Sequence, residues 1–275
     1  MTWKHFNKVS DVNKLYRDLW KEYRNVGVPV EIKKYLDIWP IQYDTQIKQQ
    51  SLLFVGLNPS YDDKSYTLEL ADNRELDDDA KIENAIEDER TAQRGKNGKE
   101  RYSYYTQFPL ICQALGINKE DWNHIDLLPF REKNQNELLG AFQLENRSFS
   151  DWFIANTDKE KLIKECVEIF LCFIELLKPK TIVIANGFIS RKIIEHTGFY
   201  YSDKREISKI EYHFSDDKLQ NLYLSKSPDR CHRYIEIENK YPLVLTSMLT
   251  GQRALDLASR ERLICDIKQL LDEID

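Results

Sequence analysis

Asn58 is the residue of this sequence whose type and setting first suggest chemistry. It lies between the apolar run from Leu52 to Leu57 and a proline, Pro59. An amide side chain can accept a hydrogen bond from a water molecule and so orient it, but it cannot act as a strong base. Taken alone, Asn58 would equally suit a helix cap or a turn. Its role therefore depends on the element that carries it.

The run from Leu52 to Leu57 predicts a central strand of a parallel sheet, because it is short, apolar and partly β-branched or aromatic. Gly56 permits a close approach of backbone or ligand, and Pro59 restricts the residue before it to extended geometry. Ligands of open α/β sheets bind outside the carboxyl ends of the strands. We therefore expect Asn58 to lie at the ligand-binding edge of the sheet.

Further segments of the chain predict neighbouring strands and helices. Apolar runs over 124–131, 181–185 and 241–246 predict three more strands, and helical periodicity covers 158–177. This alternation predicts a single α/β domain with three α/β/α layers and a short, mainly parallel four-stranded sheet. Residues 1–48 should form an N-terminal helical layer. Residues 61–100 and 200–240 read as insertions, the first an acidic, solvated lid or specificity loop and the second a hairpin or irregular segment.

Composition limits the function classes. No apolar run could span a membrane, and the first residues lack the apolar core of a signal peptide, which favours a soluble, cytoplasmic protein. The five cysteines are scattered without a Cys-x-x-Cys pair, so we expect no metal and no cofactor. The net charge of −6 argues against a nucleic-acid partner, but Arg94, Lys96 and Lys99 cluster and could contact phosphates or form a solvated loop. Nothing implies an obligate protein partner.

The segment from Val55 to Ser60 resembles the first motif of the uracil-DNA glycosylase superfamily, specifically its Gly-x-Asn-Pro branch. Later segments resemble the superfamily in the same order, including an aromatic stretch before a helix at 108–116 and Leu-Lys-Pro-Lys before the strand at 181–185. The resemblance implies that Asn58 positions a water molecule. It also implies a pocket floor built by the surrounding turn, whose members are Gly56, Leu57, Pro59 and Ser60.

The resemblance also implies an aromatic face on which a flipped base stacks. Tyr102, Tyr104, Tyr105 and Phe130 are the candidates, although at least one of the tyrosines should instead belong to the core. Asp126 lies in the segment that resembles the second strand of the superfamily, whose exit loop helps to form the pocket. Its carboxylate would be buried near Asn58 or would cap a neighbouring turn.

The turn after the last strand departs from the superfamily. Where that family usually has His-Pro-Ser or Asn-Pro-Ser, this chain has Ser247 followed by Met248 and Leu249. Ser247 could donate a weaker hydrogen bond to the base than an imidazole would. Residues beyond it would fill the gap that a flipped base leaves in the duplex, or would simply pack under the last helix. These residues are Met248, Leu249, Gln252 and Arg253.

Together these features predict a monofunctional DNA glycosylase that leaves an abasic site. The altered turn after the last strand and the long insertion favour a bulkier base than uracil, such as the hydroxymethylated or glucosylated cytosines of phage DNA. Phage defence is then one expected setting, and the sequence leaves the choice between repair and defence open. A uracil or mismatch glycosylase in repair is one alternative, and a catalytically silent nucleic-acid-binding protein is another. A third is an α/β protein that binds nucleotides or small molecules at the same sheet edge through Gly56 and the turn Asn186-Gly187. The sequence leaves the target base, the strand preference and the oligomeric state open.

Overall fold

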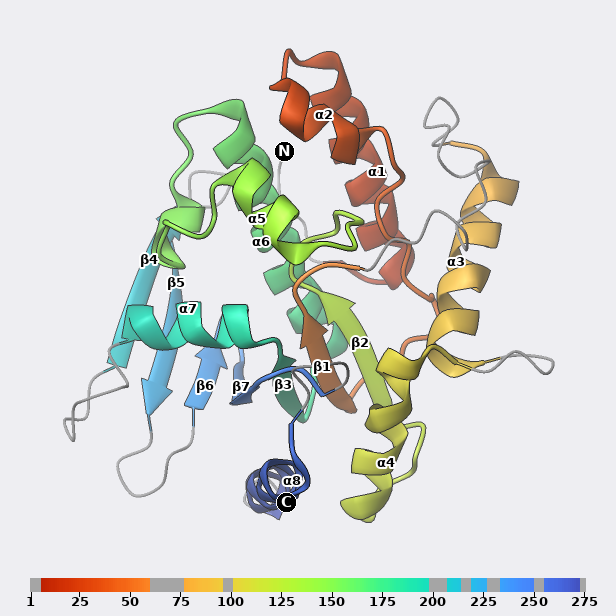
Figure 1. Cartoon of the computed structure of the whole chain (residues 1–275), viewed down its shortest axis with the longest axis vertical. Helices are drawn as coiled ribbons and strands as arrows, with labels where there is room; N and C mark the ends of the chain where they lie inside the picture. Colours follow the sequence, from red (N-terminus) through yellow and green to blue (C-terminus); the bar gives the residue numbers. More distant parts are fainter. Residues whose placement is uncertain are drawn as a thin grey trace.

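The structure is a computed structural model that describes residues 6–59, 77–95, 101–197, 207–213, 219–226, 233–249 and 255–272. All strands in these residues belong to one sheet with the order β2-β1-β3-β7-β6-β5-β4 (Figure 1). Its first four strands are mutually parallel. They are β1 (Leu52–Gly56), β2 (Trp122–Asp126), β3 (Thr181–Ala185) and β7 (Lys240–Thr246). The predicted four-stranded parallel sheet is confirmed.

Three antiparallel strands extend this sheet beyond β7. They are β4 (Ile207–His213), β5 (Leu219–Lys226) and β6 (Arg233–Glu236). The sequence predicted a hairpin or an irregular segment at 200–240, and the hairpin of β4 and β5 is present. Because β6 pairs with β7, the hairpin continues the main sheet rather than standing apart from it.

Helices cover both faces of the sheet, which gives the predicted three layers (Figure 1). Alternate strand residues serve the two faces, so that Leu53 and Val55 join one core cluster whereas Leu52 and Phe54 join the other. The first cluster packs against α1 (Val9–Asn25), α2 (Val30–Leu36), α5 (Gln135–Phe142), α6 (Asp158–Leu177) and α7 (Gly187–Thr197). The second packs against α4 (Gln107–Ala114) and α8 (Leu257–Asp272).

The acidic helix of the first insertion is α3 (Asp79–Arg94), which lies beside the edge strand β2 (Figure 1). It was expected to be solvated, but it buries Ala85, Glu89 and Gln93. A short 3-10 helix, η3 (Ser103–Thr106), leads from this region into α4. The insertion therefore contributes side chains to the interior. Among the described helices, none is long and apolar enough to cross a membrane.

The strand β2 ends five residues earlier than the apolar pattern suggested. Beyond Asp126, the amides of Leu127 and Leu128 donate hydrogen bonds to the carbonyls of Gly56 and Leu57, at 3.0 and 2.8 Å. The chain after β2 therefore follows the chain after β1 out of the sheet. This pairing holds the Asn58 turn against the segment that leads to α5.

Candidate functional site

The strand order creates a topological switch point between β1 and β3. The chain leaves β1 toward β2 on one side of the sheet, and it leaves β3 toward β7 on the other. In open α/β sheets the crevice at such a point, outside the carboxyl ends of the strands, is where ligands bind. Asn58 lies two residues after β1 and Asn186 lies one residue after β3, so both follow the strands that flank this point.

The side-chain amide of Asn58 is held in one orientation. Its Nδ2 donates hydrogen bonds to the carbonyl oxygen of Glu132, at 2.8 Å, and to that of Pro59, at 3.1 Å. The Glu132 amide in turn donates to the Pro59 carbonyl at 3.1 Å. Because both bonds use the nitrogen, the Oδ1 atom remains as the acceptor of this half-buried side chain. Asn58 is thus built to accept a hydrogen bond, as orienting a water molecule requires.

Gly56 is required by a close contact with β2. A Cβ atom at this position would lie 2.3 Å from Asp126 Oδ1 and 3.0 Å from His124 Nε2. No side chain fits in that space unless the strands move apart. Gly56 therefore accommodates protein side chains on the neighbouring strand, whereas the sequence left open a close approach of either backbone or ligand.

His124 and Asp126 form a buried acid–base pair beneath Gly56. Each is 2% exposed, and His124 Nε2 lies 3.9 Å from Asp126 Oδ1 and 3.4 Å from the Tyr104 hydroxyl. Burial lowers the pKa of His124 to about 3. Burial, and secondarily the nearby charge of Glu89, raises the pKa of Asp126 well above its usual value. At neutral pH the imidazole is therefore uncharged.

The sequence indicated Asp126 but not His124 or Glu89. Its spacing from Asp126 could have indicated His124, because the two residues are two apart on one strand and such residues point to the same face. Glu89 comes from α3, is 7% exposed, and lies 3.7 Å from Arg131 Nη2. The Tyr105 hydroxyl donates to Glu89 Oε1 at 3.4 Å. No local pattern in a polar, acidic helix predicts which carboxylate turns inward.

A cavity of about 530 Å³ lies at the carboxyl ends of β3 and β7, between α5 and α7. Ser247 and Met248 line it from the turn after β7, whereas the sequence expected Ser247 at the base and Met248 in the gap of the duplex. Asn58 is not among the described lining residues. Asn186 lines it and caps α7, because its Oδ1 accepts from the amides of Phe188 and Ile189. Arg191, Lys192 and Glu145 also line it, and the Lys192 ammonium donates to the Glu145 carbonyl at 2.6 Å.

Two contacts fix the turn that carries Ser247. The Ser190 hydroxyl in α7 donates to the carbonyl of Thr246 at 2.8 Å. The Cβ atom of Ser247 lies 4.0 Å from where a Cβ atom of Gly187 would be. The first turn of α7 therefore packs closely against the end of β7.

Aromatic candidates separate by exposure. Tyr102 is 55% exposed, and Tyr104 is half-buried against His124. Tyr105 is buried among core rings. The expectation of a stacking role for Phe130 was wrong, because this side chain is fully buried among the rings of three core residues. Those residues are Trp20, Tyr35 and Phe142.

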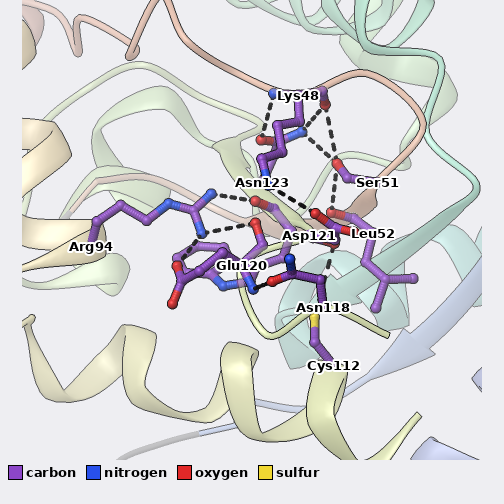
Figure 2. Close-up of polar contacts among 10 residues, drawn as sticks. Lys48, Ser51, Leu52, Arg94, Cys112, Asn118, Glu120, Asp121 and Asn123 are labelled. Atoms are coloured by element: carbon purple, nitrogen blue, oxygen red, sulfur yellow. Dashed lines mark hydrogen bonds and ion pairs between the residues drawn. The ribbon is translucent and has the colours of Figure 1, made fainter. Parts of the chain in front are cut away.

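Two expected DNA-contacting residues are also engaged inside the protein. Leu249 is 6% exposed and belongs to the core cluster under α8, which is the packing alternative rather than the wedge. The guanidinium of Arg94 lies 3.7 Å from the centre of the Trp122 ring and pairs with Glu120 at 3.1 Å. Figure 2 shows Arg94 pointing at Glu120 beside the network of Lys48 and Asn123. Arg94 thus anchors the start of β2 through protein contacts, whereas the sequence expected it in a phosphate-contacting cluster.

Other expected site residues divide between the core and the part of the chain not described. Leu57 is 2% exposed, and Pro59 is buried in the turn. Outside the described residues lie Ser60, Lys96, Lys99, Gln252 and Arg253. Within the described residues no three His, Cys, Asp or Glu side chains gather closely enough to hold a metal ion.

The chain matches no protein-family model and no curated protein.

Proposed function

We propose that the protein is a monofunctional DNA glycosylase that hydrolyses the N-glycosidic bond of a flipped, non-standard base and leaves an abasic site. The observation that carries the proposal is the fixed amide of Asn58, whose nitrogen is used by two backbone carbonyls while its oxygen remains an acceptor. The motif around it and its position at the switch point of a parallel sheet support the same reading. The proposal places the protein in the cytoplasm, with DNA as its partner.

The proposed reaction does not require a strong base from the protein. Breaking an N-glycosidic bond passes through an oxocarbenium-like sugar, so bond cleavage runs ahead of attack and the water needs orientation more than deprotonation. Asn58 Oδ1 would accept a hydrogen bond from that water and hold it beneath C1′. Ser247 would donate a hydrogen bond to the departing base, which accumulates negative charge.

The cavity beside Ser247 supports a base larger than uracil. Its volume of about 530 Å³ is within the range of small-molecule sites and exceeds what a plain pyrimidine needs. Amide and hydroxyl side chains line it, which suits a polar substituent. We therefore favour a modified cytosine, such as the hydroxymethylated or glucosylated bases of phage DNA, over uracil or mismatched thymine.

A second candidate function is binding of a phosphate-bearing small molecule in the same cavity. The observation that favours it is the cavity wall, where the first turn of α7 lies beside Arg191 and Lys192. In this reading Asn58 has no catalytic role. A catalytically silent DNA-binding protein would instead retain DNA affinity and have no activity for an Asn58→Ala substitution to remove.

An abasic-site assay tests the proposal. The protein and its Asn58→Ala variant are incubated with DNAs that contain uracil, mismatched thymine, hypoxanthine, 5-hydroxymethylcytosine or glucosylated 5-hydroxymethylcytosine, and alkali then cleaves abasic sites. We expect strand breaks on the modified-cytosine DNAs that depend on Asn58. No breaks on any DNA, with salt-dependent DNA binding, would indicate the silent binder. No breaks and no DNA binding would indicate the small-molecule protein.

A further inference from the structure

Asn186 and Gln135 form a relay of two side-chain amides in the wall of the cavity. Both residues line it, Gln135 from the start of α5 and Asn186 from the end of β3. The Oδ1 atom of Asn186 accepts from the backbone amides of Phe188 and Ile189, at 3.0 and 3.1 Å. Two backbone donors therefore determine which end of the Asn186 amide is the oxygen.

This orientation passes on to Gln135. With its oxygen at the helix cap, Asn186 presents Nδ2 to Gln135 and donates to Oε1 at 3.1 Å. The Gln135 amide must then have its nitrogen on the other side. Within the described part of the chain, Gln135 Nε2 makes no hydrogen bond, and its side chain is half-buried. The cap of α7 thus leaves Nε2 as the end of this cavity-lining amide that can donate a hydrogen bond to a ligand.

We propose that Gln135 is a specificity-determining residue that selects a base substituent carrying a hydrogen-bond acceptor, such as a carbonyl or hydroxyl oxygen. The inference rests on the proposed function and names the group on the base that the cavity reads. A donor fixed by the backbone discriminates well, because it cannot rotate to become an acceptor without breaking the bond from Asn186.

The relay can be inverted by one substitution. Asn186→Asp keeps an oxygen for the two backbone donors of α7, and a carboxylate is a good helix cap, so the fold is retained. Its second oxygen can only accept, so Gln135 turns its Nε2 toward residue 186 and presents Oε1 to the cavity. The cavity then prefers a donor. Asn136→Asp is the matched control, because it adds the same charge to another cavity-lining amide that does not belong to the relay.

The experiment titrates the protein with two nucleosides, 5-formyl-2′-deoxycytidine, whose substituent only accepts, and 5-hydroxymethyl-2′-deoxycytidine, whose substituent accepts and donates. Calorimetry should show that the unaltered protein binds both. Asn186→Asp should lose about tenfold in affinity for the formyl nucleoside relative to the hydroxymethyl nucleoside, as expected for one hydrogen bond. Asn136→Asp should change both affinities by a common factor.

The inference would be overturned by an unchanged affinity ratio in Asn186→Asp, by the same change of ratio in Asn136→Asp, or by no binding of either nucleoside. DNAs carrying the two bases separate this inference from the proposed function. If the nucleosides bind with the expected pattern but no abasic site forms, the specificity of Gln135 stands and the glycosylase proposal falls. If abasic sites form without the expected shift in rate ratio for Asn186→Asp, the glycosylase proposal stands and the inference falls.

Discussion

Replacing Asn58 by aspartate should impair the site at neutral pH, although a carboxylate is the stronger base. The substitution puts an oxygen where Nδ2 now lies, 2.8 Å from the Glu132 carbonyl and 3.1 Å from the Pro59 carbonyl. Ionised aspartate loses both donated hydrogen bonds and faces two partial negative charges. Protonated aspartate keeps one donor, so it imitates the amide.

The size of the effect follows from the two bonds. The ionised carboxylate loses the one donated bond that the protonated form keeps, at about 1 kcal/mol net, and its oxygen also faces two carbonyl oxygens without a donor, at about 1 kcal/mol more, so the ionised form is disfavoured by about 2 kcal/mol. Since one pKa unit corresponds to about 1.4 kcal/mol, the pKa of this carboxyl should rise from about 3.9 to about 5.4. A raised carboxyl pKa means that the folded state binds the proton more tightly than the unfolded chain does. Stability is therefore lost as pH rises from about 4 through the folded pKa.

The assay measures single-turnover formation of abasic sites from pH 4.5 to 8.5 for the unaltered protein, Asn58→Asp and Asn58→Ala. If only the protonated form imitates the amide, the Asn58→Asp rate should follow the protonated fraction, which at a pKa of about 5.4 falls roughly 350-fold between pH 4.5 and pH 8. Urea unfolding of the same variant should show a parallel loss of stability, a readout that needs no activity. If Asn58→Asp gains activity with rising pH and equals the unaltered protein at pH 8, the hydrogen bonds to the carbonyls of Glu132 and Pro59 are not what orients this side chain.

Three further predictions concern the surroundings of the site. Gly56→Ala should lower the free energy of unfolding by about 1–3 kcal/mol, because its Cβ would lie 2.3 Å from Asp126 Oδ1; Gly140→Ala, where no atom lies within 4 Å, should be neutral or stabilising by up to about 1 kcal/mol in the same urea titration. His124→Gln should flatten the acid limb of stability against pH. Because the pKa of buried His124 is lowered from 6.5 to about 3, the unfolded chain binds more protons between these values, and the stability of the unaltered protein falls as pH falls through this window by up to about 1.4 kcal/mol per pH unit. An equally steep limb in the variant would contradict burial of the neutral imidazole. Arg94→Gln should destabilise the protein by about 1–3 kcal/mol through the loss of its contacts with Trp122 and Glu120, while DNA affinity and its salt dependence stay unchanged; a reduced salt slope would restore Arg94 as a phosphate contact.

Local patterns determined which segments form the central sheet and the longest helix. The helix predicted at 158–177 is α6, because its apolar spacing, the Thr157 capping box and the following lysine and proline all agree. The predicted strand at 181–185 has the bounds of β3. The alternation of strands and helices also predicted the parallel arrangement, since a crossover connection of this length favours parallel neighbours.

Tertiary partners decided what local patterns could not. Phe130 and Tyr102 are both aromatic residues near polar turns, yet rings from α1, α2 and α5 cover Phe130 whereas Tyr102 is exposed. Arg94 belongs to a basic cluster in the sequence, but Glu120 and Trp122 engage it. In each case the deciding contacts are remote in sequence, so composition and spacing carry no signal for them.

Asn58 shows how far a motif can predict a site. The strand and the proline around it predict where the amide lies, because both act through neighbouring backbone. They do not predict which end of the amide faces outward, since that depends on the carbonyl of Glu132, 74 residues further along the chain. The same holds for Gln135, whose donor end is determined by a helix cap 51 residues away. The position of such a side chain at the sheet edge can thus be predicted from the local sequence. Whether it presents a donor or an acceptor to a ligand depends on contacts that only the fold creates.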